Sequence, residues 1–189
     1  TVSGRNTYDL QVPGGQDYSV MDYFAARGYD VWTVDHEGYG RSSWSGRGNS
    51  DVRTGAMDLA AVVPFILKET GAEKINIFGS SSGALRACLY TEAHPQTVAR
   101  LGLSALVYTG AGSPTLEQRR KKLPEYSTSP RRKVDLAFYE GMFNRDKPGS
   151  SEDSVPKAIA AAELPLVSEV PTGTYVDMCA NLPLTQPEA

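Results

Sequence analysis

Cysteine and histidine are both scarce, with two of each in the 189 residues. Cys88 and Cys179 lie far apart in the chain, and neither has the spacing of a metal-ligand pair. Disulfide-stapled domains carry dense, even-numbered cysteines in short secreted chains, so this sequence excludes a disulfide framework. We expect two buried, unreactive thiols, and the sparse cysteines favour a cytoplasmic location.

Excess positive charge and long apolar runs are also missing. The 19 Lys and Arg residues face 22 Asp and Glu residues, which gives a formal net charge of −3. Two short basic runs, at 119–122 and 131–133, are interpreted as solvated helix faces rather than nucleic-acid contacts. No segment approaches the roughly 18 apolar residues of a membrane span, and no signal peptide is visible. We therefore expect a small-molecule substrate as the partner, no nucleic acid, no membrane span, and no metal or organic cofactor. The oligomeric state is left open.

Strand and helix patterns alternate through the first 110 residues. The patterns predict strands at 29–34, 74–78 and 98–108 and helices at 19–27, 51–70 and 82–94. Short connections between such elements are typical of a parallel sheet with helices on its faces. Helical patterns at 131–144, 152–163 and 174–182 follow a stretch rich in proline, serine and charge. The sequence predicts an incomplete α/β core over 1–110 and a helical cap or lid over 111–189.

The segment with the clearest chemistry is Gly79-Ser80-Ser81-Ser82-Gly83. An apolar strand pattern precedes it and a helix of small residues follows it. This strand–turn–helix context is what a nucleophile elbow requires, because the turn holds the serine hydroxyl clear of the backbone. We predict that Ser81 is the nucleophile, that the Ser82 N–H is an oxyanion donor, and that glycine at both flanks avoids clashes with a Cβ atom. Ser80 and Ser82 are alternative hydroxyls, but neither has glycine two residues away on both sides.

Two phosphate-binding interpretations are weaker. Gly38-Tyr39-Gly40 lacks the third glycine of a dinucleotide fingerprint, and a loop rather than a helix follows it. The segment Gly79–Gly83 lacks the Gly-Lys-Ser/Thr ending of a phosphate loop.

A second signature precedes the elbow in the order expected of one family. The chain resembles the α/β-hydrolases in three features. Residues 28–43 have a strand pattern followed by Asp35-x-x-Gly-x-Gly-x-Ser42, the elbow follows, and His94-Pro95 comes after it. The resemblance covers nearly the whole chain and implies an α/β-hydrolase fold, a mostly parallel sheet in a three-layer sandwich with an inserted helical cap. It implies a serine esterase- or lipase-like activity, and it makes 35–42 a structural turn rather than a catalytic segment.

The rest of the catalytic machinery is not found in this sequence. In this family the triad runs Ser, then Asp or Glu, then His along the chain. His36 precedes the elbow and His94 ends the helix after it, so neither has the position of the base. Asp177 and Glu169 are the last acids in range, and both lie in cap-like helical or loop sequence. We therefore expect the base, the acid and the second oxyanion donor, next to which Thr1 and Val2 would lie, to belong to segments outside this chain.

Aromatic residues in the predicted cap hint at a small, partly apolar substrate: Tyr126, Phe138, Tyr139, Phe143 and Tyr175. The alternative that these side chains only pack the cap stays open. So do two other functions, namely a non-catalytic ligand-binding or receptor-like protein on the same fold, and a serine enzyme for acyl transfer or carbon–carbon cleavage.

Overall fold

The computed structural model describes residues 3–15, 17–46, 49–107, 112–144 and 147–180. The described chain divides into two compact units, unit 1 (Thr1–Trp44 and Arg132–Val170) and unit 2 (Ser45–Arg131 and Pro171–Ala189). The helices of unit 1 are α1 (Gly4–Tyr8), α2 (Val20–Ala25), α7 (Leu136–Asn144) and α8 (Ser154–Glu163). Unit 2 contains α3 (Val52–Thr70), β1 (Ile75–Ser80), α4 (Ser82–Ala93), the 3-10 turn η1 (Pro95–Thr97), β2 (Val98–Ser104), α5 (Pro114–Arg120), α6 (Leu123–Thr128) and α9 (Gly173–Cys179).

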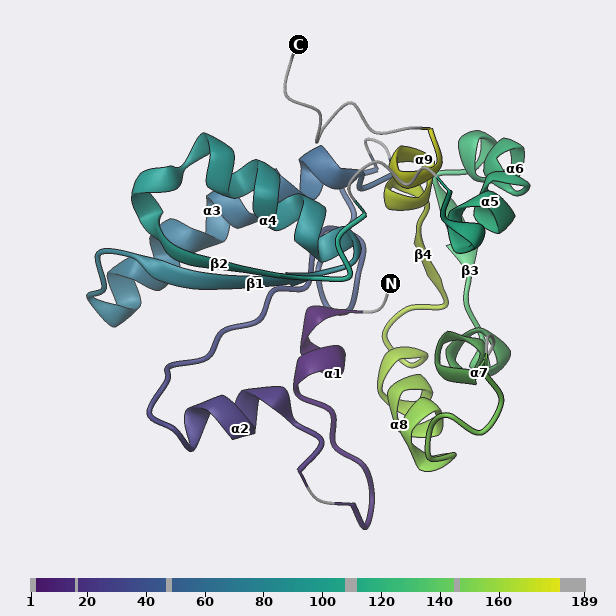
Figure 1. Ribbon diagram of the computed structural model, residues 1–189, viewed down its shortest axis with the longest axis horizontal. Coiled ribbons are helices and arrows are strands. Elements are labelled where there is room, and N and C mark those ends of the chain that lie inside the picture. Colours follow the sequence, from purple (N-terminus) through teal and green to yellow (C-terminus); the bar gives the residue numbers. More distant parts are fainter. Residues whose placement is uncertain (1–2, 16, 47–48, 108–111, 145–146, 181–189) are drawn as a thin grey trace. The chain divides into compact units, whose positions relative to one another are not determined.

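The centre of unit 2 is the parallel pair β1 and β2, in which Ile77 lies opposite Leu101 and Phe78 opposite Gly102. Helices α3 and α4 lie over one face of this pair (Figure 1). Because side chains alternate between the faces of a strand, Ile77 and Leu101 point into the apolar cluster under the helices. Phe78 points to the other face and is 59% exposed. The described pair therefore buries one of its two faces.

Helix α3 supplies much of the apolar surface over the sheet. Asp51 caps its N-terminus by accepting a hydrogen bond from the Thr54 N–H at 2.7 Å. Gly71 ends the helix with φ 69°, the left-handed conformation that glycine adopts without a Cβ penalty. Between these ends, Val63 packs with Tyr90 of α4 and Val98 of β2 in one buried cluster.

Helices α5, α6 and α9 complete unit 2 with a second apolar cluster. Its buried members are Val52, Leu85, Leu116, Tyr175 and Met178. Leu106 and Val107, which follow β2, pack against this cluster. The end of β2 that lies nearest the elbow is thus in contact with the helices that follow it in sequence.

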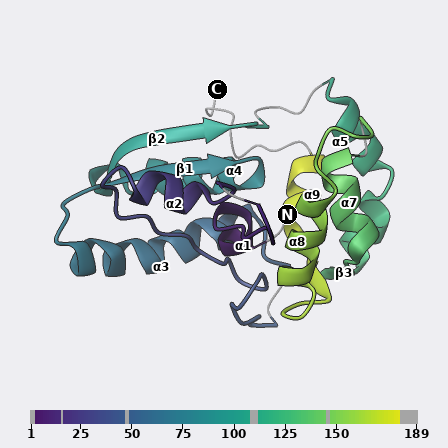
Figure 2. The same ribbon diagram turned by 90° about the horizontal axis from the view of Figure 1, so that it is seen from below.

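Unit 1 is built around α7 and α8, which lie side by side in both views (Figures 1 and 2). Tyr139 and Ile159 of these helices pack with Leu10, Val12 and Tyr39 in a core of their own. A buried carboxylate also holds this unit together. Glu163 at the end of α8 is fully buried and accepts hydrogen bonds from Ser3 and from the Asn6 Nδ2 at 2.7 Å. The α8 carboxylate thereby fixes the start of α1.

Two short strands, β3 (Arg131–Lys133) and β4 (Glu169–Pro171), form a second, two-stranded sheet. In sequence, the division between the units passes between Arg131 and Arg132 and between Val170 and Pro171. The predicted division into a core over 1–110 and a cap over 111–189 stays a prediction.

Several predicted elements agree closely with the structure, and others differ in type or in bounds. The patterns at 51–70, 74–78 and 82–94 correspond to α3, β1 and α4, while β2 ends four residues before the predicted end at Tyr108, which lies outside the described residues. The predicted strand at 29–34 is wrong, because the segment forms no strand. Its residues are β-branched and aromatic, but a strand exists only when a neighbour pairs with it, and within the described part of unit 1 no strand lies beside this segment.

Short helices account for most of the other differences. The sequence patterns assigned no helix or strand to the first 17 residues, but they contain the five-residue helix α1, with Ser3 accepting a hydrogen bond from the Asn6 N–H. The stretch rich in proline, serine and charge, at 110–130, contains α5 and α6, and the predicted helix at 131–144 begins with β3 before α7. Residues beyond 180, which include the predicted end of the last helix, lie outside the described residues. Elements of five to seven residues are too short for a periodic pattern to identify.

Candidate active site

The elbow between β1 and α4 has the backbone conformation that its sequence context predicted. Strand β1 ends at Ser80, helix α4 begins at Ser82, and Ser81 between them has φ 54° and ψ −120°. A positive φ is uncommon for a residue with a Cβ, and such a conformation costs on the order of 1–3 kcal/mol. The sharp turn is thus concentrated at the one residue whose hydroxyl was predicted to react.

Backbone contacts hold Ser81 from both sides of the turn. Its N–H donates to the Ser104 carbonyl of β2 at 2.9 Å, and its own carbonyl accepts from the Ala84 N–H at 3.0 Å. Its side chain makes no hydrogen bond that caps α4, although the residue occupies the N-cap position. The hydroxyl is therefore not engaged in capping its own helix.

The two flanking glycines have different roles. A Cβ added at Gly79 would overlap the carbonyl group of Gly83 and the backbone of Ala84, so the strand end and helix start approach too closely for a side chain. A Cβ added at Gly83 would meet no atom within 4 Å. The prediction that both glycines avoid a clash is confirmed for Gly79 and wrong for Gly83, because the helix turns the Gly83 Cβ direction into open space.

The Ser82 N–H is at the N-terminus of α4, where the first N–H groups have no partner within the helix. The aligned peptide dipoles of the 12-residue helix add partial positive charge at this end. A developing negative oxygen beside Ser81 would be stabilised by both features. The Ser82 hydroxyl itself is buried, with 1% of the residue exposed, whereas Ser81 is half-buried.

The structure separates His94 from the elbow. Ser81 and His94 flank the 12-residue helix α4, and at about 1.5 Å per residue the helix puts roughly 20 Å between them. His94 stacks on Tyr90, with ring centroids 4.9 Å apart. It is therefore a packing residue at the far end of the helix. His36 is in unit 1, where its carbonyl accepts from the Tyr39 N–H at 2.9 Å in a turn.

Residues 35–42 form a hydrogen-bonded turn in unit 1. The Asp35 carboxylate accepts from the Arg5 N–H at 3.2 Å and from the Arg41 N–H at 3.1 Å. Gly40 has φ 53°, and an added Cβ there would overlap the Asp35 carboxylate. These contacts agree with the structural role that the resemblance implied for this segment.

Asp177 and Glu169, the two acids considered above, lie in structural elements. The Asp177 Oδ2 accepts from the Val52 N–H at 2.7 Å, and burial raises the pKa of Asp177 above its ordinary value. Glu169 lies in the short strand β4. Thr1 and Val2, beside which the second oxyanion donor was expected, lie outside the described residues.

The five aromatic residues of the predicted cap divide between the two units. Tyr126 and Tyr175 stack in unit 2 with ring centroids 5.2 Å apart, and Phe138 meets Tyr139 edge to face in unit 1. Phe143 packs against the core of unit 1. Burial raises the pKa of Tyr139 well above its ordinary value, as does the Glu163 carboxylate to a smaller degree. For these side chains the structure favours packing over a role in binding.

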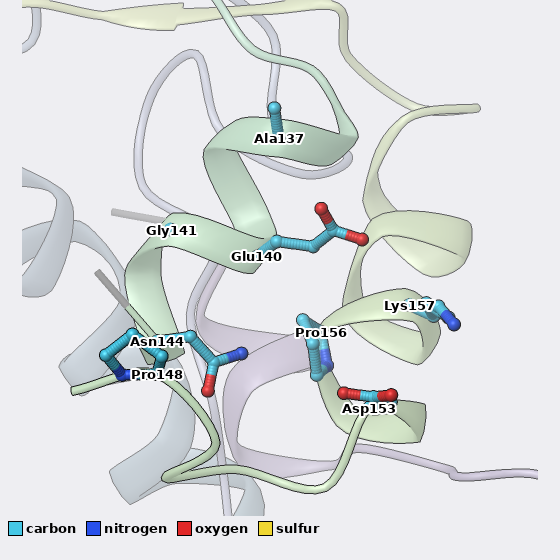
Figure 3. A pocket seen from close by; sticks show the side chains of 8 residues that line it. All are labelled: Ala137, Glu140, Gly141, Asn144, Pro148, Asp153, Pro156 and Lys157. Atoms are coloured by element: carbon cyan, nitrogen blue, oxygen red, sulfur yellow. The ribbon is translucent and has the colours of Figure 1, made fainter. Parts of the chain in front are cut away.

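A cavity of about 540 Å³ lies between α7 and α8 (Figure 3). Its lining residues are Ala137, Glu140, Gly141, Asn144, Pro148, Asp153, Pro156 and Lys157. All eight belong to unit 1, whereas Ser81 belongs to unit 2. The cavity therefore carries no argument about a substrate at Ser81.

The thiols and the first basic run have ordinary structural surroundings. Cys88 and Cys179 are free, and burial raises the pKa of both thiols, which keeps them protonated near neutral pH. The Arg119 guanidinium lies 5.0 Å from the centre of the Tyr175 ring, and the Arg120 Nε donates to the Cys179 carbonyl at 3.0 Å.

Among the described residues, no three His, Cys, Asp or Glu side chains are grouped to hold a metal ion. No described helix combines the length and apolar character needed to cross a membrane.

Comparisons with known proteins agree on the fold. A family model described as alpha/beta hydrolase fold matches residues 12–172. A monoacylglycerol lipase from Paleococcus ferrophilus is similar with a TM-score of 0.51 at 20% identity, over 86% of this chain and 58% of that one. BpoC from Mycobacterium tuberculosis H37Rv, described as a non-heme bromoperoxidase, is similar with a TM-score of 0.57 at 18% identity, over 95% of this chain and 61% of that one.

A third structure extends the same picture. An extracellular α/β-hydrolase from a Paenibacillus species has a TM-score of 0.56 at 12% identity, over 92% of this chain and 68% of that one. A comparison with curated proteins found no match. The chain spans 58% and 61% of the first two structures, less than two thirds of either. The predicted fold class is confirmed.

Proposed function

This chain belongs to the α/β-hydrolase family, and from that premise we propose that Ser81 is the nucleophile of a serine hydrolase acting on an ester or related carbonyl bond. The observation that carries the proposal is the backbone of Ser81, with φ 54° and ψ −120° between a parallel strand and a helix. A binding protein has no need to keep a serine in a conformation that costs on the order of 1–3 kcal/mol.

In the proposed mechanism, the Ser81 Oγ attacks the substrate carbonyl and the Ser82 N–H stabilises the oxyanion of the tetrahedral intermediate. A histidine takes the serine proton and later gives it to the leaving group, and an acid orients that histidine. His94 is about 20 Å from Ser81 along α4, and chain order argues against His36. We therefore assign the base and the acid to residues outside this sequence.

The 189 residues alone are expected to have almost no activity, because a serine without a base stays protonated near neutral pH. The second oxyanion donor, expected next to Thr1 and Val2, would be missing as well. Loss of one such donor typically costs roughly a hundred- to a thousand-fold in rate.

The substrate class is proposed as a small, partly apolar carboxylic ester. The lipase among the similar structures supports this class. We also propose that residues 1–110 form the catalytic core and that residues 111–189 form its cap. The proposed location of the protein is the cytoplasm.

The test is turnover of p-nitrophenyl acetate by a chain extended at both ends, compared with the 189-residue chain. The variants are Ser81→Ala and, as a matched control, Ser80→Ala at the neighbouring hydroxyl. The proposal predicts turnover by the extended chain and by Ser80→Ala, and loss of turnover in Ser81→Ala. Ligand binding without any turnover would support the receptor-like alternative instead.

A further inference from the structure

Two helices of unit 2, α4 and α9, contact the residues that begin α3. Asp177 of α9 accepts a hydrogen bond from the Val52 N–H at 2.7 Å. Arg86 of α4 donates from its Nη2 to the Ser50 carbonyl at 3.2 Å. Helices α4 and α9 are therefore anchored to the same short segment, residues 50–52.

The position of Arg86 connects this anchor to the elbow. Arg86 is four residues after Ser82, so the two side chains lie on one face of α4, a single turn apart. Ser82 is the residue whose N–H we propose as oxyanion donor. A contact that holds Arg86 therefore holds the first turn of the helix that presents Ser81 and Ser82.

The neighbouring helix leaves space for Arg86. Arg86 is buried, with 3% of the residue exposed, and its stem passes over Gly55 of α3. A Cβ at Gly55 would overlap the Cδ and Nε of Arg86. Glycine inside a helix costs roughly 0.5–1 kcal/mol relative to alanine, so α3 gives up helix stability at the point where the guanidinium passes.

The surroundings of Asp177 destabilise the charged form of its carboxylate, so its charge does not stabilise the fold. Burial is the largest influence on the Asp177 pKa and raises it, and the nearby Asp51 carboxylate raises it too. The Val52 N–H, Arg86 and Arg53 act in the opposite direction without cancelling the rise. Because the folded-state pKa lies above the unfolded value, the charged form is less stable in the fold than in water.

We propose that Arg86 and Asp177 are positioning residues, which hold the start of α4 against the start of α3 and so fix Ser81 and the Ser82 N–H in their reactive arrangement. The inference rests on the proposed function of Ser81. It assigns to α9, about 100 residues further along the chain, a part in aligning the nucleophile.

The test is the rate of Ser81 labelling by a fluorophosphonate probe in the extended chain, measured over a range of probe concentrations. The variants are Asp177→Asn, Arg86→Gln and the double variant. The control is Glu73→Gln, which makes the same charge change as Asp177→Asn at an exposed residue of unit 2. Melting temperatures are measured on the same samples at pH 7.

We expect Asp177→Asn to keep or raise the melting temperature, because the amide oxygen can still accept the Val52 hydrogen bond. Its maximal labelling rate should nevertheless fall by about ten- to a hundred-fold, because the neutral amide loses the charge attraction to Arg86 of α4, and small misplacements of reacting groups slow a reaction. The half-saturating probe concentration should stay unchanged. Arg86→Gln should lower the same rate, and the double variant should lose little more than either single variant.

Two results would overturn the inference, and they are distinguishable. If the parent chain and Glu73→Gln label at one rate and Asp177→Asn and Arg86→Gln label equally fast, the pair is only structural and the proposed function stands. If the parent chain does not label at Ser81, the proposed function fails, and the inference fails with it.

Discussion

At the scale of single residues, the elbow shows which glycine of the motif is required because a side chain would not fit. Gly79 is surrounded by backbone that an added Cβ would overlap, whereas the Gly83 Cβ direction is open. The five-residue motif alone treats the two glycines alike. The distinction comes from the direction in which α4 leaves the turn, which no local pattern encodes.

We predict opposite effects for alanine at these two positions. Gly79→Ala should lower the free energy of unfolding by about 2 kcal/mol or more, because the backbone must shift to make room. Gly83→Ala should leave it unchanged or raise it by up to about 1 kcal/mol, because alanine is the better helix former. Urea denaturation of the two variants measures the difference. Equal losses would show that the elbow is not packed as described.

A second residue-scale prediction concerns the buried carboxylate of unit 1. Glu163→Ala would leave the Ser3 and Asn6 donors without their acceptor, and we expect a loss of about 3 kcal/mol in unfolding free energy. Glu163→Gln keeps an acceptor oxygen and should lose less. Lys157→Ala, at an exposed position of the same helix, serves as the control in the urea titration. A loss in Glu163→Ala no larger than in this control would contradict the assigned hydrogen bonds.

At the scale of elements, the sequence predicted correctly those elements that form their own hydrogen bonds or have a repeating apolar pattern. Helix α3 was predicted because residues 51–70 have a clear helical period that Gly71 closes. The segment 29–34 is rich in residues that favour strands but forms no strand. A strand needs a neighbouring strand to pair with, and the tertiary fold decides whether one is present. The sequence also placed the elbow between β1 and α4, yet nothing in its pattern predicted that α9 would contact the start of α3.

Gly55 provides the prediction for α3. Helix propensity alone would make Gly55→Ala stabilising by roughly 1 kcal/mol. Overlap with the buried Arg86 side chain reverses the sign, and we expect a loss of about 1–3 kcal/mol. In a double-mutant cycle with Arg86→Ala, part of that loss should disappear, because the obstructing side chain is gone. Additive effects of the two substitutions would contradict the packing of Arg86 against Gly55.

At the scale of the whole molecule, each unit has its own apolar core, and the described parallel pair leaves Phe78 of one face exposed. The family assignment agrees with a parallel strand pair that is covered by helices. The chain spans 58% and 61% of the first two similar structures. The sequence predicted the fold class because two signatures stand in family order. It predicted no base within the chain, because His36 precedes the elbow and His94 ends helix α4.

The pH dependence of stability should carry the signature of Asp177. Its folded-state pKa lies above the ordinary value of 3.8, mainly because of burial. The contribution of the neutral carboxyl is fully present below the unfolded pKa and is lost as the pH rises through the folded pKa. Asp177→Asn should therefore gain stability relative to the parent chain as the pH rises from below 4 to neutral. Thermal melts across that range would contradict the burial of Asp177 if the difference were constant.

The central claim is that Ser81 is the nucleophile of a serine hydrolase. It is tested most directly by treating the extended chain with a fluorophosphonate probe and locating the covalent adduct by peptide mass spectrometry. We predict a single adduct on Ser81, with none on Ser80 or Ser82, and no adduct in Ser81→Ala. An adduct on a different serine, or an extended chain that stays unlabelled, would contradict the account.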